Sequence, residues 1–337
     1  MSFTVKVEPS GHEFSAEPNE AILDAAERQG ITLPYGCRNG ACGSCSGQLI
    51  SGGITYPEEE VAPIEEAGGS CLTCQASAIS DIVIHLHEVE SSKEIEVRTL
   101  PTRVEKLDRL ADDVMRVYLS IPEGQRMQFL AGQYLDFIME DSRRRAFSIA
   151  NAPHNDSAIE LHIRHVEGGE FTDHVFNSMK VGDIQTIQAP MGGFYLREES
   201  ERPLIFMAGG TGFAPLKAII EHAIHVGLNR PVHLYWGVRA ESDLYLDELA
   251  QSWADSLKDF SYTPVLSEPE EGWEGKTGWV HEAVIADHPD MSAFDLYMSG
   301  PPPMVFAGKR AFIEAGMSED NMYSDVFEWA QDNPDKE

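Results

Sequence analysis

The sequence has few positive charges and no long apolar run. Its 337 residues include 25 lysines and arginines against 56 aspartates and glutamates, which gives a net charge of −31. Such an excess of negative charge disfavours nucleic acid or an anionic membrane as a partner. No apolar run approaches the length that spans a bilayer, and the first residues lack the apolar core of a signal peptide. We therefore expect a cytoplasmic protein that binds neither nucleic acid nor membranes.

Cysteine is also scarce, and its odd count argues against a framework of disulfides. The sequence has five cysteines, three of them in the spacing Cys37-x4-Cys42-x2-Cys45, with Cys74 downstream. Plant-type ferredoxins space the ligands of a [2Fe–2S] cluster in this way, because each iron takes two thiolates. The alternative is a zinc site built from two pairs, Cys42 with Cys45 and Cys71 with Cys74, but it would leave Cys37 unused. The spacing therefore favours a [2Fe–2S] cluster.

Residues 1–90 have the pattern of a small α+β domain of the β-grasp ferredoxin kind. The expected elements are strands over 3–7 and around Phe14, a helix over 20–29 and a closing strand over 81–87. The cysteine-rich loop follows the helix. The polar run 88–94 after the last strand is typical of a linker.

The middle of the chain, residues 98–200, has short β segments separated by turn signals. The expected strands cover 114–121, 133–139, 146–150, 159–166 and 184–188. A helix over 172–179, with Thr172 as its N-cap, interrupts them. Because the strands are short and follow one another, we expect an antiparallel β-barrel.

Residues 201–330 instead alternate buried strands with helices. The expected strand and helix pairs are 203–207 with 215–225, 232–236 with 244–257, and 294–298 with 303–316. This alternation predicts an α/β domain with a parallel sheet. The whole chain is therefore expected to be a multidomain protein with an α+β, an antiparallel β-barrel and an α/β domain.

Two turns of this last domain carry its chemistry. Gly209-Gly210-Thr211-Gly212 directly follows a buried strand and precedes the helix that contains Pro215. Backbone N–H groups at the start of a helix attract anions, so this turn is typical of a phosphate site. The turn Ser299-Gly300-Pro301-Pro302-Pro303-Met304 follows another strand and should face the same crevice.

The barrel region contains the densest basic stretch of the chain, Arg143-Arg144-Arg145-Ala146-Phe147-Ser148. A solvated charged face is the ordinary explanation of such a stretch. Here, however, a guanidinium that can bind phosphate lies near an aromatic ring and a hydroxyl on one β segment. This combination suits a flavin nucleotide.

These motifs resemble those of the ferredoxin–NADP reductase-like flavin reductases that carry an N-terminal plant-type ferredoxin domain. Arg145-Ala146-Phe147-Ser148 is similar to their flavin signature Arg-x-Tyr-Ser, and Gly169-Glu170-Phe171-Thr172 is similar to their pyrophosphate loop Gly-x-x-Ser/Thr. The segment 209–215 is similar to their nicotinamide loop. The resemblance extends over about residues 3–327 and implies a [2Fe–2S] cluster, FAD and NADH or NADPH as cofactors.

The resemblance also implies roles for single residues. Arg145 would hold a flavin phosphate, Phe147 would pack on the isoalloxazine, and Ser148 would lie near flavin N5. The remaining flavin contacts would be His162, Ile163 and Arg164, largely through their backbone, with Gly169, Phe171 and Thr172. Asp325 and Phe327 would close over the flavin, and Ser299 stands where the family commonly has a cysteine near the nicotinamide.

Two assignments of ligands follow from the same resemblance. The cluster ligands would be Cys37, Cys42, Cys45 and Cys74, because Leu72-Thr73-Cys74 matches the family's last ligand segment and Cys71 does not. The nicotinamide dinucleotide would contact Gly210, Thr211, Gly212, Pro215, Gly300, Pro301 and Met304, with Arg239 and Asp243 near the adenosine ribose. Arg239 could bind a 2′-phosphate there, whereas Glu241 and Asp243 would oppose one, so we expect a preference for NADH over NADPH.

Such a protein passes electrons from NAD(P)H through the flavin and the cluster to a protein acceptor. The resemblance is strongest to reductases that serve CDP-6-deoxyhexose dehydrases in deoxysugar synthesis (CDP-6-deoxyglucoseen reductases). A Rieske dioxygenase or a diiron monooxygenase is the alternative acceptor. Residues 1–90 contain 14 acidic and three basic residues, a balance of −11. This charge fits either docking onto a basic partner or simple solvation and salt adaptation.

Overall fold

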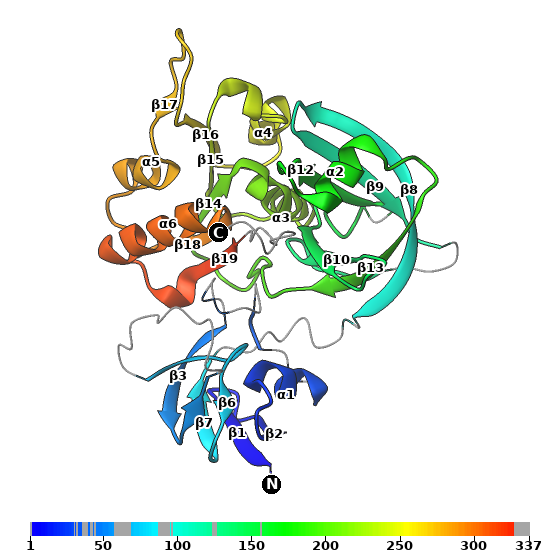
Figure 1. The fold of residues 1–337 in the computed structure, drawn as a ribbon. Coiled ribbons are helices and arrows are strands. Elements are labelled where there is room, and N and C mark those ends of the chain that lie inside the picture. The colour runs from blue at the N-terminus through cyan, green and yellow to red at the C-terminus, as the bar shows by residue number, and fades with distance from the viewer. Residues whose placement is uncertain are drawn as a thin grey trace. The chain divides into compact units, whose positions relative to one another are not determined.

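The structure is a computed structural model that describes residues 2–29, 31, 33–35, 40, 43, 45–56, 69–86, 95, 97–122, 127–155 and 157–326. The chain separates into two compact units (Figure 1). The first consists of Met1–Glu96 with Gly192–Phe194, and the second of Val97–Met191 with Tyr195–Glu337. No helix in the described ranges has the length and apolarity needed to cross a membrane.

The first unit is built on a mixed five-stranded sheet in the order β2-β1-β7-β3-β5. Its strands are β1 (Phe3–Glu8), β2 (Glu13–Ala16), β3 (Ser46–Ser51), β5 (Ser70–Leu72) and β7 (Ile82–His85), and β4 (Ile54–Thr55) pairs separately with β6 (Ser77–Ala78). The central pair β1 and β7 is parallel. The helix α1 (Ile22–Arg28) buries Ile22, Leu23, Ala25 and Ala26, the positions that helical spacing selects. The predicted α+β fold is confirmed.

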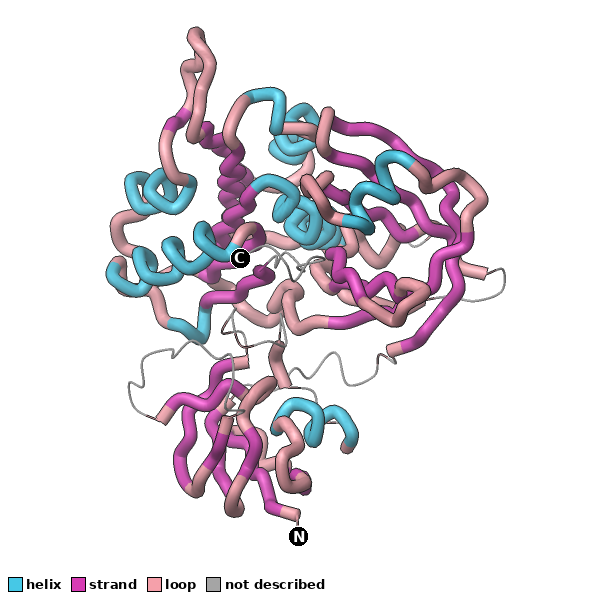
Figure 2. Tube along the Cα trace, in the orientation of Figure 1, coloured by secondary structure: helices cyan, strands magenta, loops and turns pink. Residues whose placement is uncertain are grey.

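The second unit begins with an antiparallel six-stranded sheet in the order β11-β10-β13-β8-β9-β12. Its strands are β8 (Arg98–Ala111), β9 (Val114–Ser120), β10 (Tyr134–Ile138), β11 (Arg144–Ser148), β12 (Ile159–Arg164) and β13 (Ile184–Met191). A bridge between Ile149 and Leu161 joins the two end strands, so the sheet closes into the predicted barrel. Its strands curve around a core that includes Leu135, Phe137 and Leu161 (Figure 2).

The barrel differs from the sequence prediction in several details, and β8 is not among the expected strands. Strand β11 begins at Arg144 instead of residue 146, because Arg144 and Arg145 pair with Ile138 and Phe137 of β10. Helix α2 (Glu170–Asn177) has Gly169 as its N-cap, so the prediction of Thr172 as N-cap was wrong. Thr172 instead lies inside the first turn, where its hydroxyl bonds the backbone of Val166 and Gly169.

The second unit continues into a parallel six-stranded sheet in the order β17-β16-β15-β14-β18-β19. The strands are β14 (Leu204–Gly209), β15 (Val232–Val238), β16 (Phe260–Leu266), β17 (Lys276–Thr277), β18 (Asp295–Gly300) and β19 (Met322–Val326). Helices α3 (Phe213–His225) and α4 (Asp247–Ser252) cover one face, and α5 (Val280–Asp287) and α6 (Pro302–Glu314) cover the other (Figure 1). Right-handed crossovers from the central strand β14 require this division.

The helix predicted over 244–257 was only partly right. The structure divides this stretch into the short helix α4 and a 3-10 turn, Trp253–Asp255, and a separate 3-10 turn, Glu241–Asp243, precedes it. The reason is Tyr245, whose ring packs edge-on against Phe213 and Trp236 and therefore cannot follow a regular first turn. Burial of one aromatic ring thus outweighs the local helical pattern.

Candidate cofactor sites

Two of the predicted cluster ligands meet in the first unit. The Sγ atoms of Cys45 and Cys74 lie 3.1 Å apart, and both side chains are buried. This distance exceeds the roughly 2.05 Å of a disulfide, so the two sulfurs are free to share one iron. Thr73 fixes their spacing, because its backbone N–H and its hydroxyl both donate to the carbonyl oxygen of Cys45. Cys37 and Cys42 lie outside the described residues.

Cys71 occupies a different position from these two. It lies on β5 opposite Gly47 of β3 and is fully buried. Burial, and then the neighbouring Cys74, raise the pKa of Cys71 to about 12, whereas an iron ligand is a thiolate. Tyr56, which sequence reasoning missed, supports the same segment by accepting a hydrogen bond from the N–H of Leu72 at 3.1 Å.

The predicted flavin residues of the barrel lie along β11. The Ser148 hydroxyl is buried and donates to the Asp325 carboxylate at 2.8 Å, so the structure brings β11 and β19 together as the resemblance implies. The ring of Phe147 is half-buried and packs on Phe171, with 5.5 Å between ring centroids. Burial, and then the nearby charge of Arg143, lower the pKa of Arg145. A guanidinium in such surroundings gains from an anionic partner. Phe327 lies outside the described residues.

The predicted pyrophosphate loop is a tight turn at the start of α2. A Cβ atom on Gly169 would lie 2.8 Å from the Thr172 hydroxyl and 3.2 Å from Val166, so the turn needs glycine. The backbone N–H groups at the start of α2 form the kind of terminus that binds anions. His162 and Ile163 do not offer their side chains to this region, because Ile163 belongs to the barrel core and His162 is hydrogen-bonded inside the unit.

The two turns of the parallel sheet are in contact, as predicted. A Cβ atom on Gly212 would lie 2.0 Å from the carbonyl oxygen of Ser299, and one on Gly209 would lie 2.4 Å from Met304 Sδ. The chain can therefore bring the strands β14 and β18 together only with glycine at both places. The Ser299 hydroxyl is fully buried and has no hydrogen-bond partner in the described ranges. A polar ligand in the crevice would satisfy it.

The side chain of Arg164, a residue expected to line the flavin largely through its backbone, lies beside the glycine turn. Its guanidinium lies 3.6 Å from where a Cβ atom of Gly210 would be, directly beside the glycine turn. Its Nε and Nη2 atoms are buried without a hydrogen-bond partner among the described residues, and Asp113 approaches Nε only to 3.4 Å. Backbone N–H groups at the start of a helix and a guanidinium are both groups that attract anions.

The predicted adenosine end of the nicotinamide site follows β15. Asp243 accepts a hydrogen bond from the N–H of Ala240 at 3.2 Å, and its carboxylate lies 3.8 Å from Arg239 Nε. The Arg239 side chain is 65 % exposed. The carboxylate is therefore held in place while the guanidinium is open to solvent.

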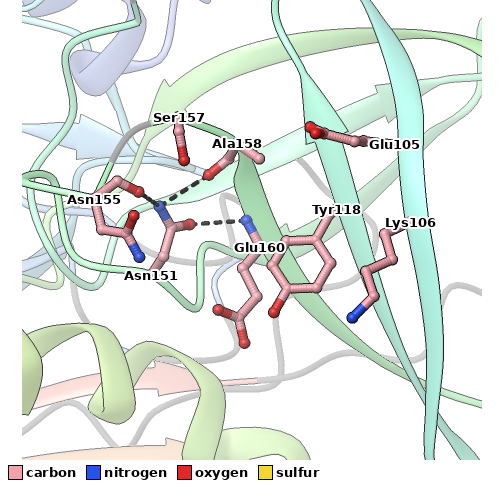
Figure 3. A pocket seen from close by; sticks show the side chains of 8 residues that line it. All are labelled: Glu105, Lys106, Tyr118, Asn151, Asn155, Ser157, Ala158 and Glu160. Carbon is pink, nitrogen blue, oxygen red and sulfur yellow. Dashed lines mark hydrogen bonds between the residues drawn. The ribbon is translucent and has the colours of Figure 1, made fainter.

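A cavity of about 350 Å³ is lined by residues of β8, β9 and β12 and of the segment that precedes β12 (Figure 3). Its lining residues are Glu105, Lys106, Tyr118, Asn151, Asn155, Ser157, Ala158 and Glu160. Asn151 holds its rim by donating to the carbonyl oxygens of Asn155 and Ala158 and accepting from the N–H of Glu160. The polar groups of Asn151 are thereby used within the fold.

Sequence reasoning also missed Glu160 and Lys217, which are buried and paired with each other between the barrel and α3, and the half-buried Tyr245, which contacts His162. A signal was present in two of them. Lys217 interrupts the apolar run Leu216-Lys217-Ala218-Ile219, and Glu160 interrupts Ile159-Glu160-Leu161. Charged residues at such positions are rarely buried unless they are paired.

Models of three protein families match successive parts of the chain. They are the 2Fe-2S iron-sulfur cluster binding domain over residues 5–78, the oxidoreductase FAD-binding domain over residues 101–195 and the oxidoreductase NAD-binding domain over residues 206–309. They follow the order of the three large sheets in the described residues.

Several relatives match this chain over nearly their whole length. The chain is 39% identical to the CDP-6-deoxy-L-threo-D-glycero-4-hexulose-3-dehydrase reductase of Yersinia pestis, over 97% of this chain and 99% of the relative. It is 32% identical to reductase component 1 of terephthalate 1,2-dioxygenase from a Comamonas species, over 97% and 98% of the two chains. A solved structure of an Amycolatopsis cytochrome P450 reductase matches with a TM-score of 0.75 and 31% identity, over 96% and 98%.

The sulfur positions give a test of the cluster ligands. Cys74→Ser should abolish cluster assembly, because it removes the sulfur that lies 3.1 Å from Cys45. Cys71→Ser should retain the cluster with normal visible absorbance and iron content. Both variants make the same chemical change in the same short segment, so each serves as the control for the other. Cluster loss in Cys71→Ser with retention in Cys74→Ser would reverse the assignment.

Proposed function

Because the chain belongs to the family of iron–sulfur flavoprotein reductases, which join a [2Fe–2S] ferredoxin domain to FAD-binding and NAD-binding domains, we propose that it serves a sugar dehydrase. The observation that carries this proposal is the 39% identity over 99% of a CDP-6-deoxyhexulose dehydrase reductase. The family itself fixes the general activity. The protein is an NAD(P)H-dependent oxidoreductase that transfers electrons through FAD and a [2Fe–2S] cluster.

The acceptor we propose is a dehydrase that acts on a CDP-linked 6-deoxyhexulose. An oxygenase component is the second candidate, because the terephthalate dioxygenase reductase is 32% identical over almost the same length. We also propose that the protein works in the cytoplasm, where thiols such as Cys45, Cys71 and Cys74 stay reduced.

The residues that would hold the cofactors lie partly in the barrel and partly around the parallel sheet. Arg145 and the start of α2 would bind the flavin pyrophosphate, and Ser148 would contact the ring system. When bound, FAD takes two electrons from the nicotinamide as a hydride and lets them leave singly to the iron–sulfur cluster. The glycine turn 210–212 would bind the nicotinamide pyrophosphate, and the buried hydroxyl of Ser299 would face the nicotinamide ring. The hydrogen bond between Ser148 and Asp325 would hold the Ser148 hydroxyl in one orientation.

We further propose that the Arg164 side chain binds the nicotinamide pyrophosphate. Its guanidinium lies beside Gly210, and its Nε and Nη2 atoms have no hydrogen-bond partner among the described residues. Arg164→Met should raise the KM for NADH about tenfold or more, since a hydrogen bond to a charged group contributes about 1.5–3 kcal/mol. The measurement is steady-state reduction of a dye, with Lys106→Met as a control that removes a surface cation from the same barrel. An unchanged KM together with loss of bound FAD would show that Arg164 contacts the flavin instead of the nicotinamide dinucleotide.

The carboxylate of Asp243 favours NADH. It is held by the N–H of Ala240 and lies next to Arg239, so a 2′-phosphate would meet a fixed negative charge. The wild-type protein should therefore have a higher kcat/KM with NADH. Asp243→Asn should reduce the difference in kcat/KM between NADH and NADPH, because Arg239 could then bind the 2′-phosphate. A tenfold advantage of NADPH in the wild type, about 1.4 kcal/mol, would show that Arg239 dominates instead.

The acidic charge of residues 1–90 gives a test of the acceptor. Its balance of −11 should steer a basic face of the dehydrase toward the cluster, and salt screens such attraction beyond roughly 8 Å at physiological ionic strength. The rate of electron transfer to the dehydrase should therefore fall as salt rises, while reduction of a small uncharged dye should stay nearly constant. The same salt series with an oxygenase component provides the comparison. Faster, salt-sensitive transfer to the oxygenase would make that class the acceptor.

A further inference from the structure

A buried lysine lies in the helix that follows the glycine turn. Lys217 of α3 is only 4 % exposed, and its helix neighbours Leu216 and Ala218 are fully buried. Removing an ammonium group from water costs several kcal/mol unless acceptors replace the lost hydration. Lys217 is therefore a costly residue whose surroundings must compensate for it.

Three acceptors surround this ammonium group. Its Nζ atom donates to the carbonyl oxygen of Ala150 at 3.0 Å, to Glu160 at 3.2 Å and to Glu221 at 3.0 Å. An ammonium group has three N–H donors, so all of them are used. Glu221 belongs to the same helix, but Ala150 and Glu160 belong to the barrel. The lysine thus ties α3 to two points of the barrel.

Both barrel points lie next to the predicted flavin residues. Ala150 comes two residues after Ser148, and its N–H donates to the carbonyl oxygen of Glu160 at 2.8 Å. Glu160 donates its own backbone N–H to Asn151 (Figure 3), and its carboxylate accepts a hydrogen bond from Lys217 at 3.2 Å. A shift of α3 would therefore displace the residues that directly follow β11, the strand that carries the predicted flavin residues.

A second path runs from Glu160 back to the glycine turn. Glu160 lies 2.8 Å from His162 Nε2, and His162 Nδ1 lies 3.1 Å from the Tyr245 hydroxyl. The Tyr245 ring packs edge-on against Trp236, whose Nε1–H donates to the carbonyl oxygen of Gly210 at 2.9 Å. Glu160 is thus connected to both ends of the segment that begins at the turn and enters α3.

The charges of this group are settled by its surroundings. Burial alone would raise the pKa of Glu160, but the His162 hydrogen bond and the Lys217 charge lower it overall. Burial lowers the pKa of His162. At neutral pH the carboxylate is therefore ionised and the imidazole neutral. His162 Nε2 then donates to Glu160, and Tyr245 donates to His162 Nδ1.

We propose that Lys217, with Glu160, is a positioning residue for hydride transfer. The pair holds β11, which carries the predicted flavin residues, at a fixed distance from the glycine turn 210–212. This inference rests on the proposed flavin and nicotinamide sites. Hydride transfer depends on the distance between the donor and acceptor atoms, and a displacement of 1 Å can cost about a hundredfold in rate. A fixed ion pair between the two binding elements limits such displacement.

The decisive variant is the double substitution Lys217→Met with Glu160→Gln. It removes the two buried charges, those of Lys217 and Glu160, together, a change that buried ion pairs commonly tolerate. Glu221, the second carboxylate that Lys217 contacts, keeps its charge, but its side chain is 24 % exposed and can be hydrated. Lys217→Met alone would leave Glu160 without its cation and serves only as a supporting variant. Lys309→Met, which removes an ammonium group paired with Glu319 on the surface at 2.9 Å, is the matched control.

We expect the double variant to bind FAD and to be reduced by NADH at least tenfold more slowly per bound flavin in stopped-flow measurements. The isotope effect with 4-deuterated NADH should rise as the hydride step becomes slower. Hydrogen exchange without NADH should be faster in both 146–151 and 213–220, a readout independent of activity. Lys309→Met should match the wild type in all three.

Wild-type reduction rates in a folded, FAD-loaded double variant would overturn the proposal. A lower melting temperature without a change in rate per flavin would also do so, because it would mean that the group only stabilises the fold. Failure of the wild-type protein to bind FAD or to be reduced by NADH would instead refute the proposed function. The two failures are therefore distinguishable.

Discussion

The close approach of two backbones at the carboxyl edge of the parallel sheet constrains everything around the nicotinamide site. The turns after β14 and β18 come so near each other that a side chain on Gly212 would overlap the carbonyl oxygen of Ser299. The approach encloses the Ser299 hydroxyl, which is buried without a hydrogen-bond partner among the described residues. Glycine at these positions is therefore a packing requirement of the two turns.

The barrel complements this edge with charge. Arg164 brings a guanidinium to Gly210, and Ser148 reaches Asp325 of β19, so residues far apart in the chain meet within one compact unit. Lys217 acts in the opposite direction by carrying a positive charge from α3 into the barrel. The barrel and the parallel-sheet part of the second unit therefore each contribute side chains to the other. Such mutual contributions are what keep two binding sites at a constant separation.

The sequence was most informative where chemistry and spacing coincide. The glycine turn, the Arg-x-Phe-Ser stretch and the order of strands and helices all correspond to elements of the structure, because each depends on local backbone geometry. The misses have a common physical origin in tertiary packing. Tyr245 interrupts a helical pattern to reach Trp236, and Thr172 bonds Val166 instead of capping α2. Lys217 and Glu160 look like misplaced charges until the fold pairs them.

The serine at position 299 has a chemical consequence for the whole chain. With serine there, all five cysteines of the sequence, the last of them Cys74, fall within the first compact unit. A hydroxyl is inert to peroxides and to alkylating reagents, whereas thiolates oxidise stepwise and in part irreversibly. Oxidants that attack thiols thus have no target in the unit with the flavin and nicotinamide residues. Damage to thiols would therefore interrupt electron transfer at the iron–sulfur cluster and leave NAD(P)H oxidation by the second unit intact.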